Sequence, residues 1–87
     1  MRKCGYITRR GNFIDLDKLY PDMEHYMSKH DQYCYDNDLE EEDLMDKGWV
    51  KLTTVCDPYI YMLFRPLAKE QVNTLIDLGY KIEEGDM

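Results

Sequence analysis

The side chains best suited to bind another molecule are seven carboxylates that fill seven of the eleven positions from 36 to 46, with no basic residue before Lys47. A run this dense repels itself and resists burial, so it must face water or the basic surface of a partner. Carboxylates along a helix, spaced comparably to DNA phosphates, can occupy a channel that normally holds nucleic acid. We therefore predict a partner-binding surface made of Asp36, Asp38, Glu40, Glu41, Glu42, Asp43 and Asp46.

Two tyrosines precede this run and flank Cys34. Tyrosine combines a large apolar ring with a polar tip, which suits it to contact surfaces. We expect Tyr33 and Tyr35 to join the acids in binding the partner. The alternative is a solvated helix whose charges keep a small protein in solution.

Cysteine and histidine supply the residue types of a zinc or nucleophilic site, but the spacing is unfavourable. There is no paired C-x-x-C, and four residues between the histidines place their side chains well apart around a helix. A Cys–His nucleophile lacks an orienting third residue and an oxyanion hole. Packing is the simpler role for these residues, which are Cys4, Cys34, Cys56, His25 and His30.

Metal sites made of carboxylates are also weakly indicated. Asp15 and Asp17 would point the same way on a strand and could begin a magnesium site, but two carboxylates alone are common. The acidic run lacks the alternating oxygen ligands, central Gly and terminal Glu of an EF-hand. We therefore expect no metal, no cofactor and no enzymatic activity.

The overall charge restricts the partners. The chain has 87 residues and a net charge of -7, with 18 acids against 11 bases, which argues against direct binding to nucleic acid or an anionic membrane. The three cysteines are odd in number and widely spaced, which fits reduced thiols. No apolar run approaches the roughly 18 residues needed to span a bilayer. These features predict a cytoplasmic protein.

The elements that must position these residues can be assigned from turn and helix patterns. A β-hairpin is predicted for residues 4–16 around Gly11, which can adopt the positive φ of a short turn. Aromatic and β-branched residues predict a second hairpin from residues 49–55 and 59–64. Three helices are expected: one from about Pro21 to His30 or a little beyond, one from a cap at Asn37 or Asp38 to Gly48, and one between Pro66 and Gly79.

Within the second helix, Leu44 and Met45 should dock on the core while the acids form a ridge. The order ββααββα predicts a single α+β domain over residues 1–87, with helices covering one face of an antiparallel sheet of two hairpins. Residues 80–82 would add a short strand or pack as a tail, and residues 83–87 should be frayed.

Several segments resemble small acidic proteins encoded by phages and prophages of Gram-positive bacteria. They are Gly5-Tyr6-Ile7 to Gly11-Asn12-Phe13-Ile14, Gly48-Trp49-Val50-Lys51-Leu52, and Arg65-Pro66-Leu67 to Gln71. The resemblance spans most of the chain but carries over no functional residue. Among small acidic phage proteins a recurring role is inhibition of host defence, including anti-CRISPR proteins that occupy the basic DNA-binding surface of an RNA-guided nuclease.

The resemblance, together with size and charge, implies a non-enzymatic inhibitor in the host cytoplasm that binds a nucleic-acid-handling protein, with a CRISPR nuclease as the leading candidate. Two alternatives remain open. One is a self-associating phage structural or regulatory module, such as a homodimer, that uses its tyrosines and methionines. The other is a small metal-dependent enzyme that uses His25, His30, Cys34 or the Asp15 and Asp17 pair.

Overall fold

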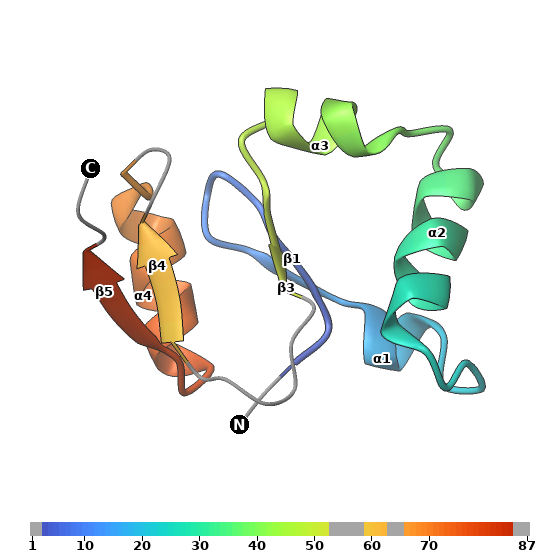
Figure 1. Ribbon diagram of the computed structural model, residues 1–87, viewed down its shortest axis with the longest axis horizontal. Coiled ribbons are helices and arrows are strands. Elements are labelled where there is room, and N and C mark those ends of the chain that lie inside the picture. Colours follow the sequence, from blue (N-terminus) through green and yellow to red (C-terminus); the bar gives the residue numbers. More distant parts are fainter. Residues whose placement is uncertain (1–2, 53–58, 63–65, 85–87) are drawn as a thin grey trace.

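The structure is a computed structural model that describes residues 3–52, 59–62 and 66–84 (Figure 1). Strands and helices mix along the chain, which confirms the predicted α+β class. In chain order the elements are β1 (Gly5–Ile7), β2 (Phe13–Asp15), α1 (Leu16–Leu19), α2 (Tyr26–Asp36), α3 (Glu41–Asp46), β3 (Val50–Leu52), β4 (Tyr59–Met62), α4 (Lys69–Asp77) and β5 (Lys81–Glu84).

The first predicted hairpin is confirmed. Strands β1 and β2 pair antiparallel, with Tyr6 opposite Ile14. The turn between them contains Gly11 at a φ of 87°, a conformation that favours glycine because it has no Cβ. A Cβ at Gly11 would also overlap the backbone of Glu70 on α4, so this turn lies directly against that helix.

The second predicted hairpin is wrong. β3 pairs antiparallel with β1 and completes a three-stranded sheet of order β2-β1-β3. β4 instead pairs in parallel with β5 in a separate two-stranded sheet. β1 is buried along its whole length, and buried backbone groups need hydrogen-bond partners. Pairing with β2 on one edge and β3 on the other supplies them. Residues 53–58, which include Cys56 and the predicted turn, and residues 63–65 lie outside the described part of the chain.

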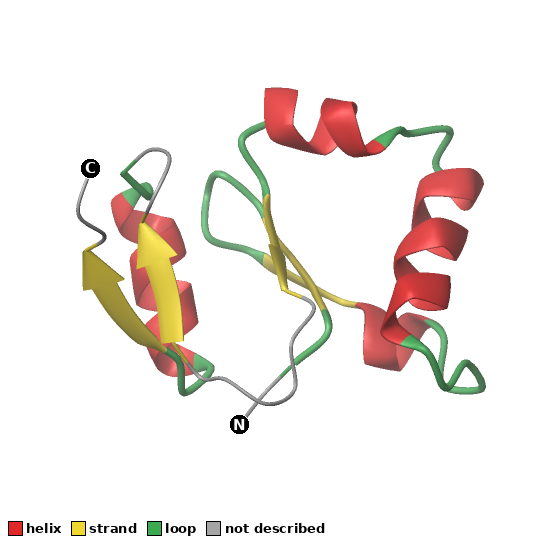
Figure 2. Ribbon diagram, in the orientation of Figure 1, coloured by secondary structure: helices red, strands yellow, loops and turns green. Residues whose placement is uncertain are grey.

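Helices cover both faces of the three-stranded sheet, not one face as predicted (Figure 2). Tyr6 and Ile7 are fully buried and, as neighbours on a strand, point to opposite faces. Tyr6 belongs to a core with Cys4, Leu16 and Leu44 on the side of α1, α2 and α3. Ile7 belongs to a second core with Leu52, Leu75 and Tyr80 on the side of α4 and β5.

The first helical region differs from the prediction of a helix over residues 21–30. A short helix, α1, begins where the strand was expected to end, because the Asp15 side chain accepts a hydrogen bond from the Lys18 N–H at 3.2 Å. Pro21 lies in a turn and is not a first helical residue. The main helix starts later, at Tyr26, and continues to Asp36.

The helix that carries most of the acids is shorter than predicted. Asp38 adopts a left-handed φ of 53°, which prevents a continuous helix between α2 and α3. Helix α3 therefore begins only after its N-cap residue, Glu40. Leu44 is buried and docks the helix on the core, as predicted. Met45 was expected to dock as well but is 76% exposed. One turn and a half of helix can bury only the narrow stripe that Leu44 occupies.

The last helix is confirmed, and Gly79 ends it with a φ of 94°. The polar Gln71 is fully buried in this helix, whereas the apolar Ile76 is 56% exposed. The Gln71 side chain accepts from the Ala68 N–H at 2.9 Å and donates to the Gly48 carbonyl at 2.6 Å. β5 then extends to Glu84, so the first two residues of the expected frayed tail lie in a strand, and residues 85–87 are outside the described part.

Candidate functional site

The acidic segment, residues 36–46, turns a corner on the surface between the end of α2 and the end of α3 (Figure 1). Six of its seven carboxylates belong to exposed residues, and Asp43 is half-buried. The segment therefore faces solvent, as its composition predicts. Its members nevertheless differ in what they contact.

Asp36 is held by the protein itself. Its carboxylate accepts hydrogen bonds from the Tyr20 hydroxyl and the Gln32 side-chain amide, both at 2.7 Å. Burial, with the hydrogen bond to Asp36, raises the pKa of Tyr20 to about 12. These contacts fasten the end of α2 to the chain that follows α1.

Asp43 and Glu41 also have structural partners. The Asp43 carboxylate accepts from the Glu40 N–H at 2.8 Å and so caps the start of α3. The Glu41 carboxylate lies 2.6 Å from the ammonium group of Lys51 on β3, and this contact lowers the pKa of Glu41. Together they fix α3 internally and tie it to the sheet.

Three other acids are available to a partner. Asp38, Glu42 and Asp46 are exposed, and their carboxylates make no hydrogen bond or ion pair with any residue in 3–52, 59–62 or 66–84. Glu40 is also exposed, at the N-cap of α3. We call Asp38, Glu42 and Asp46 the free acids.

The two tyrosines predicted beside the acids lie in different surroundings. Tyr35 is 74% exposed and stands free on α2 next to Asp36. Tyr33 is half-buried and packs against the ring of Tyr6, with 5.2 Å between the ring centroids. Tyr35 is thus placed to contact a partner, whereas much of Tyr33 serves the core.

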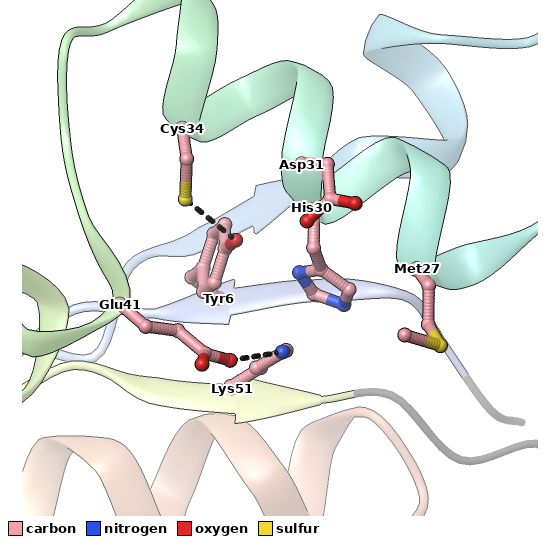
Figure 3. Close-up of a pocket in the computed structure, with 7 residues that line it drawn as sticks. All are labelled: Tyr6, Met27, His30, Asp31, Cys34, Glu41 and Lys51. Carbon is pink, nitrogen blue, oxygen red and sulfur yellow. Dashed lines mark hydrogen bonds and ion pairs between the residues drawn. The ribbon is translucent and has the colours of Figure 1, made fainter.

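A pocket of about 240 Å³ opens between α2, α3 and the sheet (Figure 3). The pair Glu41 and Lys51 forms one side, and the Tyr6 hydroxyl lies 3.9 Å from Cys34 Sγ on another. His30 reaches into it from α2 (Figure 3). The lining residues are Tyr6, Met27, His30, Asp31, Cys34, Glu41 and Lys51.

His30 is 3% exposed, and one of its ring nitrogens is engaged. Nε2 lies 3.2 Å from the carbonyl oxygen of Leu52 and 3.6 Å from the Sγ of Cys4. Burial, and secondarily the charge of Lys51, lowers the pKa of His30 to about 4. The ring is therefore neutral near pH 7. Its Nδ1 is buried and has no hydrogen-bond partner among the described residues.

The cysteines near His30 are poorly suited to nucleophilic chemistry. Burial raises the pKa of Cys4 to about 11, so its sulfur remains a protonated thiol near neutral pH, and the thiolate is the nucleophilic form. Cys34 is half-buried and contacts the Tyr6 hydroxyl, whose own pKa is raised by burial. The sulfur in contact with the His30 ring is that of Cys4, whereas Cys34 lines the same pocket from one turn further along α2.

The remaining candidate ligands have structural contacts or stand apart. Asp15 caps α1, and Asp17 pairs with Lys29, so neither is a free magnesium ligand. His25 is exposed at the N-cap of α2. Within residues 3–52, 59–62 and 66–84, no three His, Cys, Asp or Glu side chains gather closely enough to hold a metal ion.

Comparison with protein-family models, with curated proteins and with solved structures finds no match to this chain. Among the described residues, no helix combines the length and apolar character needed to cross a membrane.

The pocket was not predicted from the sequence, because its residues come from β1, α2, α3 and β3. Lys51 is the most informative of them. Strand alternation places it on the face opposite Leu52, and its partner across the sheet is Tyr6. That pairing could be anticipated only by knowing that β3 lies beside β1, which no local pattern indicates.

Proposed function

We propose that the protein is a non-enzymatic inhibitor that binds the basic, nucleic-acid-binding surface of another protein through its acidic segment. The observation that supports this proposal is the division among the acids. Asp36, Glu41 and Asp43 hold the segment in shape, while the free acids have no partner within the described residues. Unpaired exposed carboxylates on a fixed frame suit a basic partner surface.

The frame lowers the cost of binding. A flexible acidic peptide loses conformational entropy when it is ordered on a partner, whereas a preorganised one does not. The Asp43 cap, the ion pair to Lys51 and the buried Leu44 fix α3 before any partner arrives. Carboxylates held in this way can compete with the phosphates of a nucleic acid for one basic channel.

The partner class follows from the resemblance to small acidic phage proteins. We propose a nucleic-acid-handling protein of a bacterial host, acted on in the host cytoplasm, with an RNA-guided nuclease as the leading candidate. Such an enzyme holds its heteroduplex and displaced strand in positively charged channels. Occupation of such a channel by the acidic segment would exclude the nucleic acid.

The test is capture of the partner from host lysate at physiological ionic strength. The variant Asp38→Asn/Glu42→Gln/Asp46→Asn removes three negative charges without touching the structural acids. The matched control Asp22→Asn/Glu24→Gln/Asp77→Asn removes three charges from exposed positions elsewhere. We expect the wild type and the control to capture a nucleic-acid-binding protein that DNA or RNA displaces. Equal capture by the first variant would contradict the proposal.

Exposed apolar side chains favour a second candidate function, self-association as a structural or regulatory module. Met27, Met45 and Tyr35 are 77%, 76% and 74% exposed. Large exposed apolar groups often mark contact surfaces. Sedimentation over a wide concentration range tests this, because a dimer should appear as concentration rises and should be lost in Met27→Lys/Met45→Lys. A monomer at every concentration would exclude this second function.

A further inference from the structure

We infer that the pocket between α2, α3 and β3 receives an arginine side chain. The inference rests on the proposed function for the source of that side chain, which would be the basic partner. The preference for arginine follows from the groups that line the pocket (Figure 3).

The first of these groups is the buried nitrogen of His30. The carbonyl oxygen of Leu52 can only accept a hydrogen bond, so the neutral ring carries its proton on Nε2. Nδ1 is then an acceptor, and no described residue donates to it. Buried acceptors in folded proteins are nearly always paired, so a missing donor points to a ligand. A ligand that fits here must bring N–H or O–H groups.

The second group is the carboxylates at the mouth of the pocket. Asp31 follows His30 on α2, is exposed, and makes no ion pair with any residue that the structure describes. Glu41 lies on the opposite side and shares its charge with Lys51 at 2.6 Å. The lining therefore carries one carboxylate in excess of its ammonium groups. A cation complements it better than an anion does.

The shape and walls of the pocket favour guanidinium over ammonium. A volume of about 240 Å³ is several times the roughly 30 Å³ share of one water molecule, so a side chain can enter. The Tyr6 ring and the Met27 side chain give partly apolar walls. Guanidinium is planar, weakly hydrated and has five N–H donors, so it can lie against the exposed Met27 side chain and donate to Asp31. Nδ1 of His30 is covered in the free protein, so a small shift of the ring must accompany donation to that nitrogen.

The test is an NMR titration of the whole protein with N-acetylarginine methylamide, with N-acetylcitrulline methylamide as the uncharged control of similar shape. We expect the arginine probe to shift the His30 ring nitrogens and the amides of Asp31 and Cys34, with a dissociation constant on the order of millimolar. The citrulline probe should cause much smaller shifts. Absence of shifts at these residues, or equal shifts from both probes, would overturn the inference.

Variants at the mouth of the pocket sharpen the test, because the exposed Asp31 can be changed without disturbing the core. Asp31→Asn should weaken binding of the arginine probe by about threefold or more. Asp77→Asn on α4, across the sheet, should bind like the wild type. Lys51→Met should strengthen binding because it releases the carboxylate of Glu41. If Asp31→Asn binds as tightly as Asp77→Asn, the inference is wrong.

The titration and the capture experiment can fail separately. If the arginine probe does not bind but the triple variant of the free acids loses the partner, the pocket inference fails and the proposed function stands. If the probe binds and the triple variant still captures the partner fully, the pocket stands and the acidic segment is not the binding surface.

Discussion

Lys29 of α2 is 7% exposed, and its ammonium group lies 2.5 Å from Oδ1 of Asp17 on α1. The hydrogen bond between them raises the pKa of Lys29. Asp17 also accepts from the Cys4 N–H at 3.3 Å through its other carboxylate oxygen. One carboxylate therefore joins α1, α2 and the start of the sheet.

Replacing Asp17 should destabilise the protein more than replacing any free acid. Asp17→Asn leaves the Lys29 ammonium group buried without a counter-charge, which should lower the free energy of unfolding by about 2 kcal/mol, since the partly exposed carboxylate reduces the effect. Urea unfolding measures the difference. Asp22→Asn, at an exposed turn, is the control, and equal stability of the two variants would show that the ion pair contributes nothing.

Acid should destabilise the fold through His30. Its pKa is about 4 in the folded protein, below the ordinary 6.5, so the unfolded chain binds more protons and stability falls as the pH drops from about 6.5 to 4. The loss should reach about 3 kcal/mol, at 1.36 kcal/mol for each pH unit.

Two glutamine variants isolate this effect. His30→Gln keeps a donor for the Leu52 carbonyl but does not titrate, so its stability should depend less on pH over this range. His25→Gln, at an exposed position, should retain the wild-type pH dependence. Urea unfolding at several pH values measures how the free energy of unfolding of each variant depends on pH. The same dependence in both variants would contradict the role of His30.

Gly5 should not tolerate a larger residue. It is buried in β1, and a Cβ there would overlap the carbonyl oxygen of Ile14 on the neighbouring strand. Gly5→Ala should cost about 3 kcal/mol, because backbone atoms of a central strand cannot move aside as a side chain can. A thermal unfolding midpoint equal to that of the wild type would show that the two strands can separate at little cost.

The structural and free acids should differ in stability as well as in binding. Asp43→Asn weakens the hydrogen bond that caps α3 and should lower the free energy of unfolding by about 0.5 to 1 kcal/mol. Glu42→Gln, one residue earlier, should be neutral within about 0.5 kcal/mol. If chemical denaturation gives the opposite order, the division among the acids is wrong.

Local patterns predicted the elements whose causes are local. Gly11 marked the first hairpin, and Pro66 and Gly79 bracketed α4. The short helix α1 was missed because the Asp15 that caps it is also a residue type common in turns, so the sequence around it does not single out a helix. The partner of β3 was missed because strand pairing across some 45 residues depends on burial of β1, not on the intervening sequence.

The candidate site divides in the same way. Charge density alone indicated that residues 36–46 face solvent, since so many carboxylates cannot be buried together. The sequence did not show that Asp36 accepts from Tyr20 or that Glu41 pairs with Lys51, because these partners lie on other elements. Only Gln32 is on the same helix as the acid that it contacts, Asp36. The state of His30 was equally hidden, because its Nε2 contacts the carbonyl oxygen of Leu52 at the end of β3, an element that no local pattern places beside α2.

The central claim, that the free acids bind a basic partner surface, is tested most directly by measuring the affinity for the captured partner as the salt concentration is varied. The wild type and Asp22→Asn/Glu24→Gln/Asp77→Asn should lose at least about tenfold in affinity between roughly 50 and 200 mM salt. Asp38→Asn/Glu42→Gln/Asp46→Asn should bind more weakly at every concentration, with a shallower dependence on salt. An affinity and a salt dependence equal to those of the wild type in that variant would contradict the account.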